Sequence, residues 1–386
     1  MTLDGSLLGP AFGTARAVTA TDDRALLAAL CEAEAALARA CARVGLVTPS
    51  QADAVTAACD ELAAGDPAAV GRDAVAGGNP VIPLVRDLRA RVEARAGADA
   101  AAAVHLGATS QDILDSALML LAYRTLGLTL AELDACATAC ADLARAHRLT
   151  PMTARTLLQP AAPTTFGVLA ATWGTGLDRA GGGLARVRAG LPVQLGGAVG
   201  TLAGWHPYGF DVVAAFAADL GLAVPAAPWH SERTVVTDLA GALGTAAAAV
   251  AKPALDLVLL AQGEVGEVRE AVPGGSSAMP HKQNAIAAAT ARAAAAQAPG
   301  LVATVLAATP ELQRGAGPWH AEWPALTGLL RATTGAATRL HDALSGLRVD
   351  TGAMARNLDR LPGAVGTAAL GHAGDLVDRF LAGRPA

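Results

Sequence analysis

The apolar residues of this chain recur at intervals of three and four positions over long stretches, and that spacing predicts helices. No alternation of apolar and polar positions between turns, and no repeat of roughly 20–50 residues, interrupts the pattern. We therefore predict an all-α fold, a bundle of long helices. The expected helices cover residues 23–46, 82–96, 111–147, 164–188, 237–270, 285–306 and 342–358.

Polar segments that contain glycine or proline separate these helices. They lie at residues 77–80, 105–110, 151–163, 194–200 and 273–284. Ser50 is expected to cap a further helix that opens after Thr48, and Pro253 to bend the helix in which it lies. We expect an N-terminal helical domain at 1–105, a central long-helix bundle at 106–340 and a short, reduced C-terminal helical remnant at 341–386.

Composition narrows the classes of function. Hydrophobic residues make up 53% of the chain but aromatic residues only 3%, so alanine and leucine supply the apolar mass and favour helix. The net charge of −5 and the lack of a basic cluster argue against nucleic-acid binding. Mean hydropathy is +0.38, yet no run of about 18 uncharged apolar residues suggests a membrane span. We expect the apolar excess in a bundle core or an oligomer interface.

The N-terminal sequence has no signal-peptide pattern, so a cytoplasmic location is predicted. The cysteines form no CxxC pair, and neither histidines nor cysteines show metal-ligand spacing. No metal is therefore predicted. Five cysteines are expected to be buried thiols in a reducing compartment: Cys31, Cys41, Cys59, Cys136 and Cys140.

The most informative stretch is residues 274–284, Gly-Gly-Ser-Ser-Ala-Met-Pro-His-Lys-Gln-Asn. Paired glycines let a ligand approach the backbone, and two hydroxyls follow. Lys282 and Asn284 precede a helix whose first N–H groups are free, which predicts an anion site beneath a hydroxyl. A solvated surface loop is the alternative. Only two of the 29 basic residues are lysines, Lys252 and Lys282, which indicates that the second position requires an ammonium.

This stretch resembles the signature of the fumarase/aspartase superfamily. Three other segments resemble further signature regions of the same superfamily. They are His105-Leu-Gly-Ala-Thr-Ser-Gln-Asp112, Ala154 to Gly167, and Gln262-Gly-Glu-Val-Gly-Glu267. The resemblance covers residues 5–360, roughly the whole chain. The glycines at 196–200 lack the strand and the lysine of a phosphate loop, and we interpret them as a tight turn lining the pocket.

The resemblance implies elimination of a group β to a carboxylate, without a cofactor. Ser276 is then the base, used as an alkoxide, and the carbanion forms as a doubly charged aci-carboxylate. Lys282 and Asn284 are expected to hold that carboxylate, because stabilising charge where it develops is often the largest catalytic contribution. His105 is the third catalytic candidate: it either contacts the substrate or caps the following helix.

The remaining matched residues are expected to bind a small polycarboxylate, which needs several cations around it. These candidates are Asn79, Thr109, Ser110, Gln111, Arg155, Gln159, Arg233, Met279 and Arg314. The resemblance also implies a homotetramer in which each active site uses loops from three subunits. An isolated chain is therefore expected to be inactive, and neither nucleic acid nor membrane is an expected partner.

Within the superfamily, the chain resembles the 3-carboxy-cis,cis-muconate cycloisomerases. The segments 78–83, 228–233 and 314–324 carry this likeness. Leu157 stands where fumarase and adenylosuccinate lyase have a histidine, and a leaving carboxylate needs less acid help than an amine. Lactonisation in aromatic catabolism is thus the expected reaction. The alternatives are a related lyase, acting on nitrosuccinate or on an adenylosuccinate- or fumarate-type substrate, and a non-catalytic structural relative.

Overall fold

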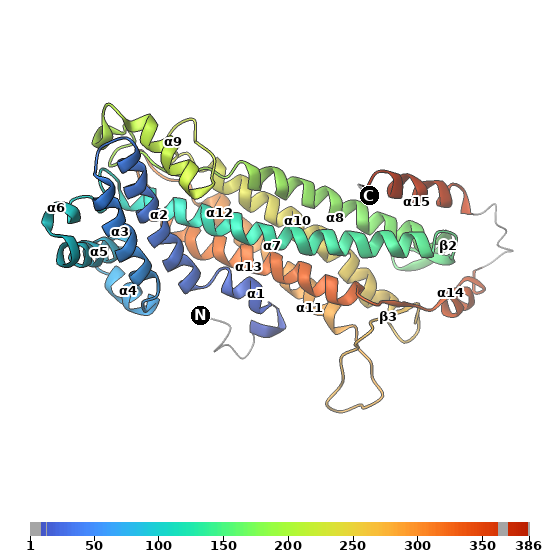
Figure 1. Ribbon diagram of the computed structural model, residues 1–386. Coiled ribbons are helices and arrows are strands. Elements are labelled where there is room, and N and C mark those ends of the chain that lie inside the picture. The colour runs from blue at the N-terminus through green and yellow to red at the C-terminus, as the bar shows by residue number, and fades with distance from the viewer. Residues whose placement is uncertain (1–8, 13, 362–369, 385–386) are drawn as a thin grey trace.

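The computed structural model describes residues 9–12, 14–361 and 370–384, and it is an elongated bundle of helices (Figure 1). Its centre is formed by α7 (Ser110–Ala146), α8 (Phe166–Ala189), α10 (Thr234–Leu260) and α13 (Pro318–Leu344). Helices α7 and α10 each pack against both α8 and α13, so the core lies between the four. Because α10 and α13 begin beside the start of α7, these three run parallel and α8 runs opposite to them.

A second group of helices covers the end of the bundle at which α7 begins (Figure 1). Helix α2 packs against α3, α7 and α9, and α5 packs against α3 and α6. Helix α9 belongs to this group in space although it lies far along the sequence. The bounds are α2 (Asp23–Arg43), α3 (Pro49–Ala63), α4 (Pro67–Ala74), α5 (Val81–Ala96), α6 (Ala98–Ala101) and α9 (Gly209–Leu220). Helix α1 (Ala15–Thr19) instead packs against α13.

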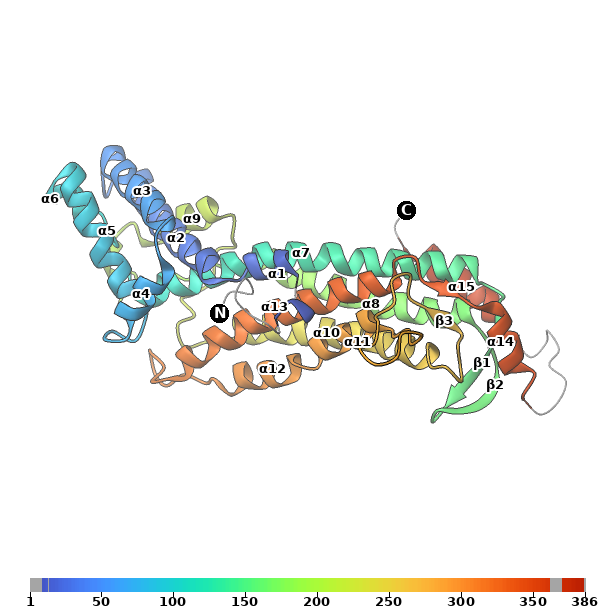
Figure 2. The same cartoon turned by 90° about the horizontal axis from the view of Figure 1, so that it is seen from below.

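The opposite end carries a β-hairpin that projects from the bundle (Figure 2). Strand β1 (Pro151–Thr156) pairs with β2 (Gln159–Thr165), and β3 (Val268–Arg269) pairs with β4 (Arg348–Val349), both antiparallel. Helix α14 contacts β1 and α15 contacts α8. The remaining elements are η2 (Gly9–Ala11), η3 (Ala203–Trp205), α11 (Ile286–Ala295), α12 (Ala298–Ala307), α14 (Thr351–Leu358) and α15 (Ala373–Ala382).

The predicted all-α class is confirmed, but several element boundaries are wrong for local reasons. Thr48, not Ser50, caps α3: its hydroxyl accepts the Gln51 N–H and the Gln51 side chain returns to the Thr48 N–H. The helix expected over 237–270 ends at Leu260 with Ala261 as its C-cap, and the chain turns further on at Gly266, whose φ is 61°. Segment 151–163, expected to be a loop, forms most of the hairpin.

Two prolines account for most of the remaining differences. Pro299 opens α12, so the helix expected over 285–306 is broken into α11 and α12. Pro324 lies inside α13, a helix that the sequence pattern did not predict. The helix expected over 342–358 is instead the end of α13, a turn, β4 and α14.

Within the described ranges, two helices are long and apolar enough to cross a membrane by length and composition, α7 and α10. The apolar window of α7 is 72% buried inside the protein, whereas that of α10 is 44% buried. Core helices pass the same test, so both are weak evidence for a span. The five cysteines are free and buried, as the sequence predicts.

Candidate active site

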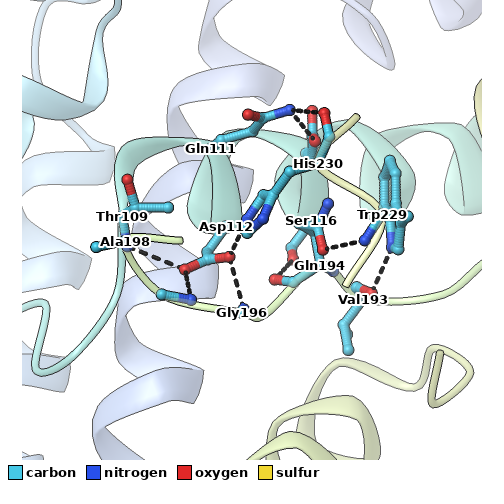
Figure 3. Close-up of polar contacts among 12 residues, drawn as sticks. Thr109, Gln111, Asp112, Ser116, Val193, Gln194, Gly196, Ala198, Trp229 and His230 are labelled. Carbon is cyan, nitrogen blue, oxygen red and sulfur yellow. Dashed lines mark hydrogen bonds and ion pairs between the residues drawn. The ribbon is translucent and has the colours of Figure 1, made fainter. Parts of the chain in front are cut away.

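The first polar cluster surrounds the start of α7 and centres on Asp112 (Figure 3). The Asp112 carboxylate accepts the N–H of Thr109 at 2.9 Å, which caps the helix. It also accepts the N–H groups of Gly196 and Gly197 at 2.8 and 2.9 Å and lies 2.7 Å from His230 Nε2. Asp112 is fully buried, so these contacts tie the start of α7 firmly to the glycine turn.

Gln111 is held within the same cluster. It is 2% exposed, and its Nε2 donates to the His230 carbonyl at 2.8 Å and to Asp115 at 3.2 Å. Its Oε1 accepts from Arg314 Nη1 at 3.2 Å. The preceding residue, Ser110, is partly exposed, and its hydroxyl makes no hydrogen bond within the described part of the chain. The structure thus brings together three of the predicted substrate-binding residues, Thr109, Gln111 and Arg314.

Arg314 lies over the glycine turn. Its Nη2 donates to the carbonyls of Gly197 and Ala198, both at 2.9 Å. Burial lowers the pKa of Arg314, and this outweighs the opposite influence of Asp112 and Asp115. No carboxylate lies in an ion pair with Arg314 among the described residues, so its charge is available to an anionic ligand.

Arg233 has a different environment. It is 6% exposed, and it donates to Asp115 at 2.6 and 3.2 Å and to both oxygens of Glu322. The Trp319 indole donates to Asp115 at 2.9 Å, and the guanidinium lies 4.8 Å above the Trp229 ring. The predicted direct contact with substrate does not fit this burial. Arg233 instead links α7, α10 and α13 through a buried charge network.

His105 and Asn79 lie in the loops beside this cluster. His105 Nδ1 is 2.6 Å from Glu34 Oε1, and the residue has a φ of 58°. Gly107 follows with a φ of 72°, and a Cβ there would lie 2.7 Å from the Trp205 ring. Asn79 is 8% exposed, and its Oδ1 accepts the Val81 N–H at 3.1 Å. Asn79 therefore supports the start of α5 by a local turn.

Two tryptophans pack against each other beside this cluster. Trp319 and Trp323 meet edge to face with centroids 4.7 Å apart, and the exposed His320 ring lies against both. A Cβ at Gly78 would lie 3.5 Å from His320 Nε2, so the 77–80 loop passes beside this imidazole.

The second region is the β1–β2 hairpin. Arg155 forms a bidentate pair with the fully buried Glu267, at 3.0 and 2.8 Å, and Asn357 donates to the same carboxylate at 2.8 Å. Leu157, in the hairpin turn, is 97% exposed with a φ of 50°, and Gln159 is exposed at the start of β2. Leu157 and Gln159 thus face away from the single chain.

The third region is the loop from Gly274 to Asn284, which we call the serine loop. Its neck is closed by two backbone hydrogen bonds between these residues, of 2.9 and 3.0 Å. The Asn284 side chain donates to the Gly275 carbonyl at 3.0 Å, and its oxygen accepts no hydrogen bond from the described residues. A Cβ at Gly274 would lie 2.7 Å from the Ile286 side chain, so the neck can close only with glycine there.

Ser276 lies at the exposed part of the serine loop. Its Oγ accepts the N–H groups of Ala278 at 3.3 Å and Met279 at 3.1 Å. Two donors aimed at one oxygen favour its negatively charged form, which is the form that a serine base needs. Lys282 is exposed and forms no ion pair with the described residues.

A cavity of 760 Å³ lies between the serine loop and the end of α10. The loop and the opposite wall contribute polar groups of both charges. They are His281, Lys282 and Asn284, and Gln262, Arg269 and Glu270. A second cavity, of 560 Å³, lies under the hairpin and includes Arg155.

One chain does not bring these regions together. Helix α7 has 37 residues, so Thr109 at its start and Arg155 just beyond its end are about 50 Å apart. Helix α10 has 27 residues, and it carries the chain about 40 Å from the Asp112 cluster to the segment before the serine loop. Figures 1 and 2 show the same separation.

Sequence reasoning missed the buried acidic residues that support the site. They are Glu34, Asp112, Asp115, Glu267 and Glu322. Asp112 and Glu267 are the last residues of two of the signature segments, so the sequence did contain a signal for them. His230 lies within the segment 228–233. No motif indicated Glu34. Among the described residues, no group of three or more histidines, cysteines or acidic residues is arranged to hold a metal ion.

The fold and the serine loop define an elimination enzyme built on long helices. The chain belongs to the lyase family of the fumarase/aspartase superfamily, since the family model described as Lyase matches residues 14–300. The chain is therefore an enzyme of that superfamily, as the sequence predicts.

Individual relatives refine this assignment. The chain is 43% identical over 364 residues to 3-carboxy-cis,cis-muconate cycloisomerase of Bradyrhizobium diazoefficiens, covering 93% of this chain and 80% of the relative. It is 44% identical over 377 residues to nitrosuccinate lyase of Streptomyces davaonensis, covering 94% and 79%. The crystal structure of 3-carboxy-cis,cis-muconate lactonizing enzyme from Pseudomonas putida matches with a TM-score of 0.87 at 35% identity, covering 97% and 87%.

Proposed function

We propose that this enzyme catalyses the reversible lactonisation of 3-carboxy-cis,cis-muconate. The observation that carries the proposal is the likeness to a cycloisomerase over 93% of the chain, with the serine loop intact. Leu157, in place of an acid histidine, supports it further. A departing carboxylate is a weak base and needs no proton donor at that position.

The residues of the serine loop have separate roles in this reaction. In ring closure, a substrate carboxylate oxygen attacks the carbon β to a second carboxylate, and the Ser276 hydroxyl gives its proton to the α carbon. In the reverse direction, the Ser276 alkoxide removes the α proton, and the carboxylate leaves with the bonding electron pair. Lys282 and the Asn284 amide stabilise the aci-carboxylate between these steps.

The other carboxylates bind near the start of α7. Thr109, Ser110 and Arg314 supply hydrogen-bond donors and one charge there. Gln111 orients Arg314 by accepting from its guanidinium, because both amide donors of Gln111 are used by His230 and Asp115. Arg155, Gln159 and Met279 contribute from the hairpin and the serine loop. We keep Arg233 as a support for this surface, because its donors are used by Asp115 and Glu322.

We propose that three chains complete each site, within a homotetramer. The length of α7 keeps the signature regions of one chain apart. A complete site therefore needs signature regions from other chains. Helix α12 is apolar, yet only Ala298 and Val305 of it are buried within one chain. An uncovered apolar helix fits burial against a second copy. Mass photometry is expected to show four chains, and a stable, fully active monomer would contradict the composite site.

A second candidate is elimination of nitrite from nitrosuccinate. The 44% identity to a nitrosuccinate lyase over 94% of the chain favours it. Nitrite, like a carboxylate, leaves without an acid, so Leu157 does not separate the two reactions. Both substrates are small polycarboxylates, and both reactions fit a cytoplasmic enzyme with the free thiols seen here.

An ultraviolet assay with carboxymuconate, fumarate and nitrosuccinate in parallel separates these candidates. We expect loss of the diene absorbance with carboxymuconate and no turnover of the other two. Turnover of nitrosuccinate alone would select the second candidate. No turnover of any substrate by the assembled enzyme would contradict both.

A further inference from the structure

His105 and Glu34 form a buried pair that joins two distant parts of the sequence. His105 Nδ1 lies 2.6 Å from Glu34 Oε1, across a separation of 71 residues. The Glu34 side chain is fully buried and that of His105 is 13% exposed. Nδ1 is therefore occupied, whereas Nε2 makes no hydrogen bond to the described residues.

The burial of Glu34 indicates the charge of the ring. Oε2 of Glu34 is buried and meets no donor within the described ranges of the chain. Such a carboxylate is costly unless a cation pairs with it, and His105 is the partner in place. His105 also adopts left-handed backbone, with a φ of 58°, to reach α2. Strain of this kind is characteristic of functional sites.

The charged groups around the ring come from three elements. They are Glu34 on α2, Arg89 on α5 and Asp112 on α7. Burial lowers the pKa of His105 and Arg89 acts in the same direction, but Glu34 and Asp112 outweigh both and raise the pKa. The ring therefore stays charged to a higher pH than a free histidine.

We propose that Glu34 is a positioning residue of the active site. It fixes the His105 ring through Nδ1 and so presents Nε2–H as a charged donor to a substrate carboxylate at the start of α7. The inference rests on the function proposed above. It assigns His105 to substrate binding rather than to helix capping, and it leaves proton transfer to Ser276. The positive end of the α7 dipole favours an anion in the same place.

The first test measures the pKa of His105 in the assembled enzyme, by NMR of histidines labelled at Cε1, with His105→Gln to assign the signal. We expect a wild-type pKa above about 6.5 and a lower one in Glu34→Gln. Glu32→Gln is the matched control: it removes an exposed carboxylate on the same helix, paired with Arg124, and should leave the pKa unchanged. A wild-type pKa below that of a free histidine, or no change in Glu34→Gln, overturns the proposal.

The second test separates binding from turnover. Glu34→Gln is expected to raise KM about tenfold with kcat within about twofold. Binding needs the charged ring, which is lost as pH rises through its pKa. The fall of kcat/KM at high pH should therefore begin at lower pH in this variant. Glu34→Asp keeps the carboxylate charge, so it should restore part of the wild-type KM and part of the wild-type pH dependence of kcat/KM.

The outcomes separate this inference from the proposed function. A lowered pKa with unchanged KM rejects the positioning role. Absence of turnover by the wild type rejects the proposed function, and the NMR result still decides whether Glu34 controls His105. If Glu34→Gln does not fold, the wild-type pKa and the Glu34→Asp kinetics carry the test.

Discussion

The start of α7 and the serine loop contain the two halves of the proposed chemistry, but they are built in opposite ways. At the start of α7, the buried Asp112 carboxylate fixes the positions of Thr109 and Gln111 through contacts within one chain. The serine loop has its neck closed by backbone hydrogen bonds, while Ser276 and Lys282 remain exposed. The proposed recognition groups are therefore held in place within one chain, whereas the proposed proton-handling groups of the serine loop are exposed on it.

This difference has an energetic meaning. A buried, fully paired cluster binds without further ordering, but a change within it costs folding stability. An exposed loop can change without loss of stability, and the proposed base in it, Ser276, is expected to gain strength when water is excluded. Variants in the two regions should therefore separate loss of folding from loss of turnover.

The largest expected effect is that of Ser276→Ala. Removing a general base costs about 10² to 10⁴-fold in kcat, and an exposed side chain contributes little to folding. Turnover should fall by that factor while mass photometry and circular dichroism match the wild type. Retained turnover would place the base elsewhere.

Asp112→Ala is expected to act on stability instead. It leaves the N–H groups of Gly196 and Gly197 and the His230 ring without their buried partner, at a cost of about 3–5 kcal/mol. Urea denaturation measures this as a lower midpoint. The matched control is Asp53→Ala, which removes an exposed carboxylate on α3, and its free energy of unfolding should stay within about 0.5 kcal/mol of that of the wild type.

The two lysines offer a closer comparison. Lys282→Arg should lower kcat about 100-fold, because a flat guanidinium cannot replace a point charge at the aci-carboxylate. Lys252→Arg is the control, since its partner Asp256 accepts a hydrogen bond from either cation. Equal kinetics for the two variants would show that the ammonium at 282 is not required.

Substitutions of two glycines should have the smallest effects, and they test only how much room the backbone leaves for a Cβ atom. Gly107→Ala should cost about 1–3 kcal/mol, because φ is 72° and the new methyl would meet the Trp205 ring. Gly275→Ala, in the serine loop, meets nothing within 4 Å and should change stability by less than about 0.5 kcal/mol. Thermal unfolding compares them, and equal losses would remove the contrast between the two regions.

The sequence predicted the helical class and most of the long helices because their apolar spacing is local information. It failed where a single residue is misleading, as at Pro324 inside α13. A proline suggests a helix end, and only tertiary packing keeps α13 continuous through it.

Motifs identified the residues that face a ligand better than those that support them. Thr109, Gln111 and Arg314 lie together as expected, because the signature carried them. Arg233 was assigned to substrate, since sequence alone cannot show that Asp115 and Glu322 occupy its guanidinium. The Glu34–His105 pair depends on long-range packing, so no local pattern could have predicted it.

The length of α7 has a genetic consequence if the composite site is correct. A single polypeptide would then supply parts to several catalytic centres at once, so one defective copy in a mixed assembly damages centres that its neighbours also need. Conversely, two variants that are inactive for different reasons could assemble together, and a fraction of their catalytic centres would then contain only intact regions.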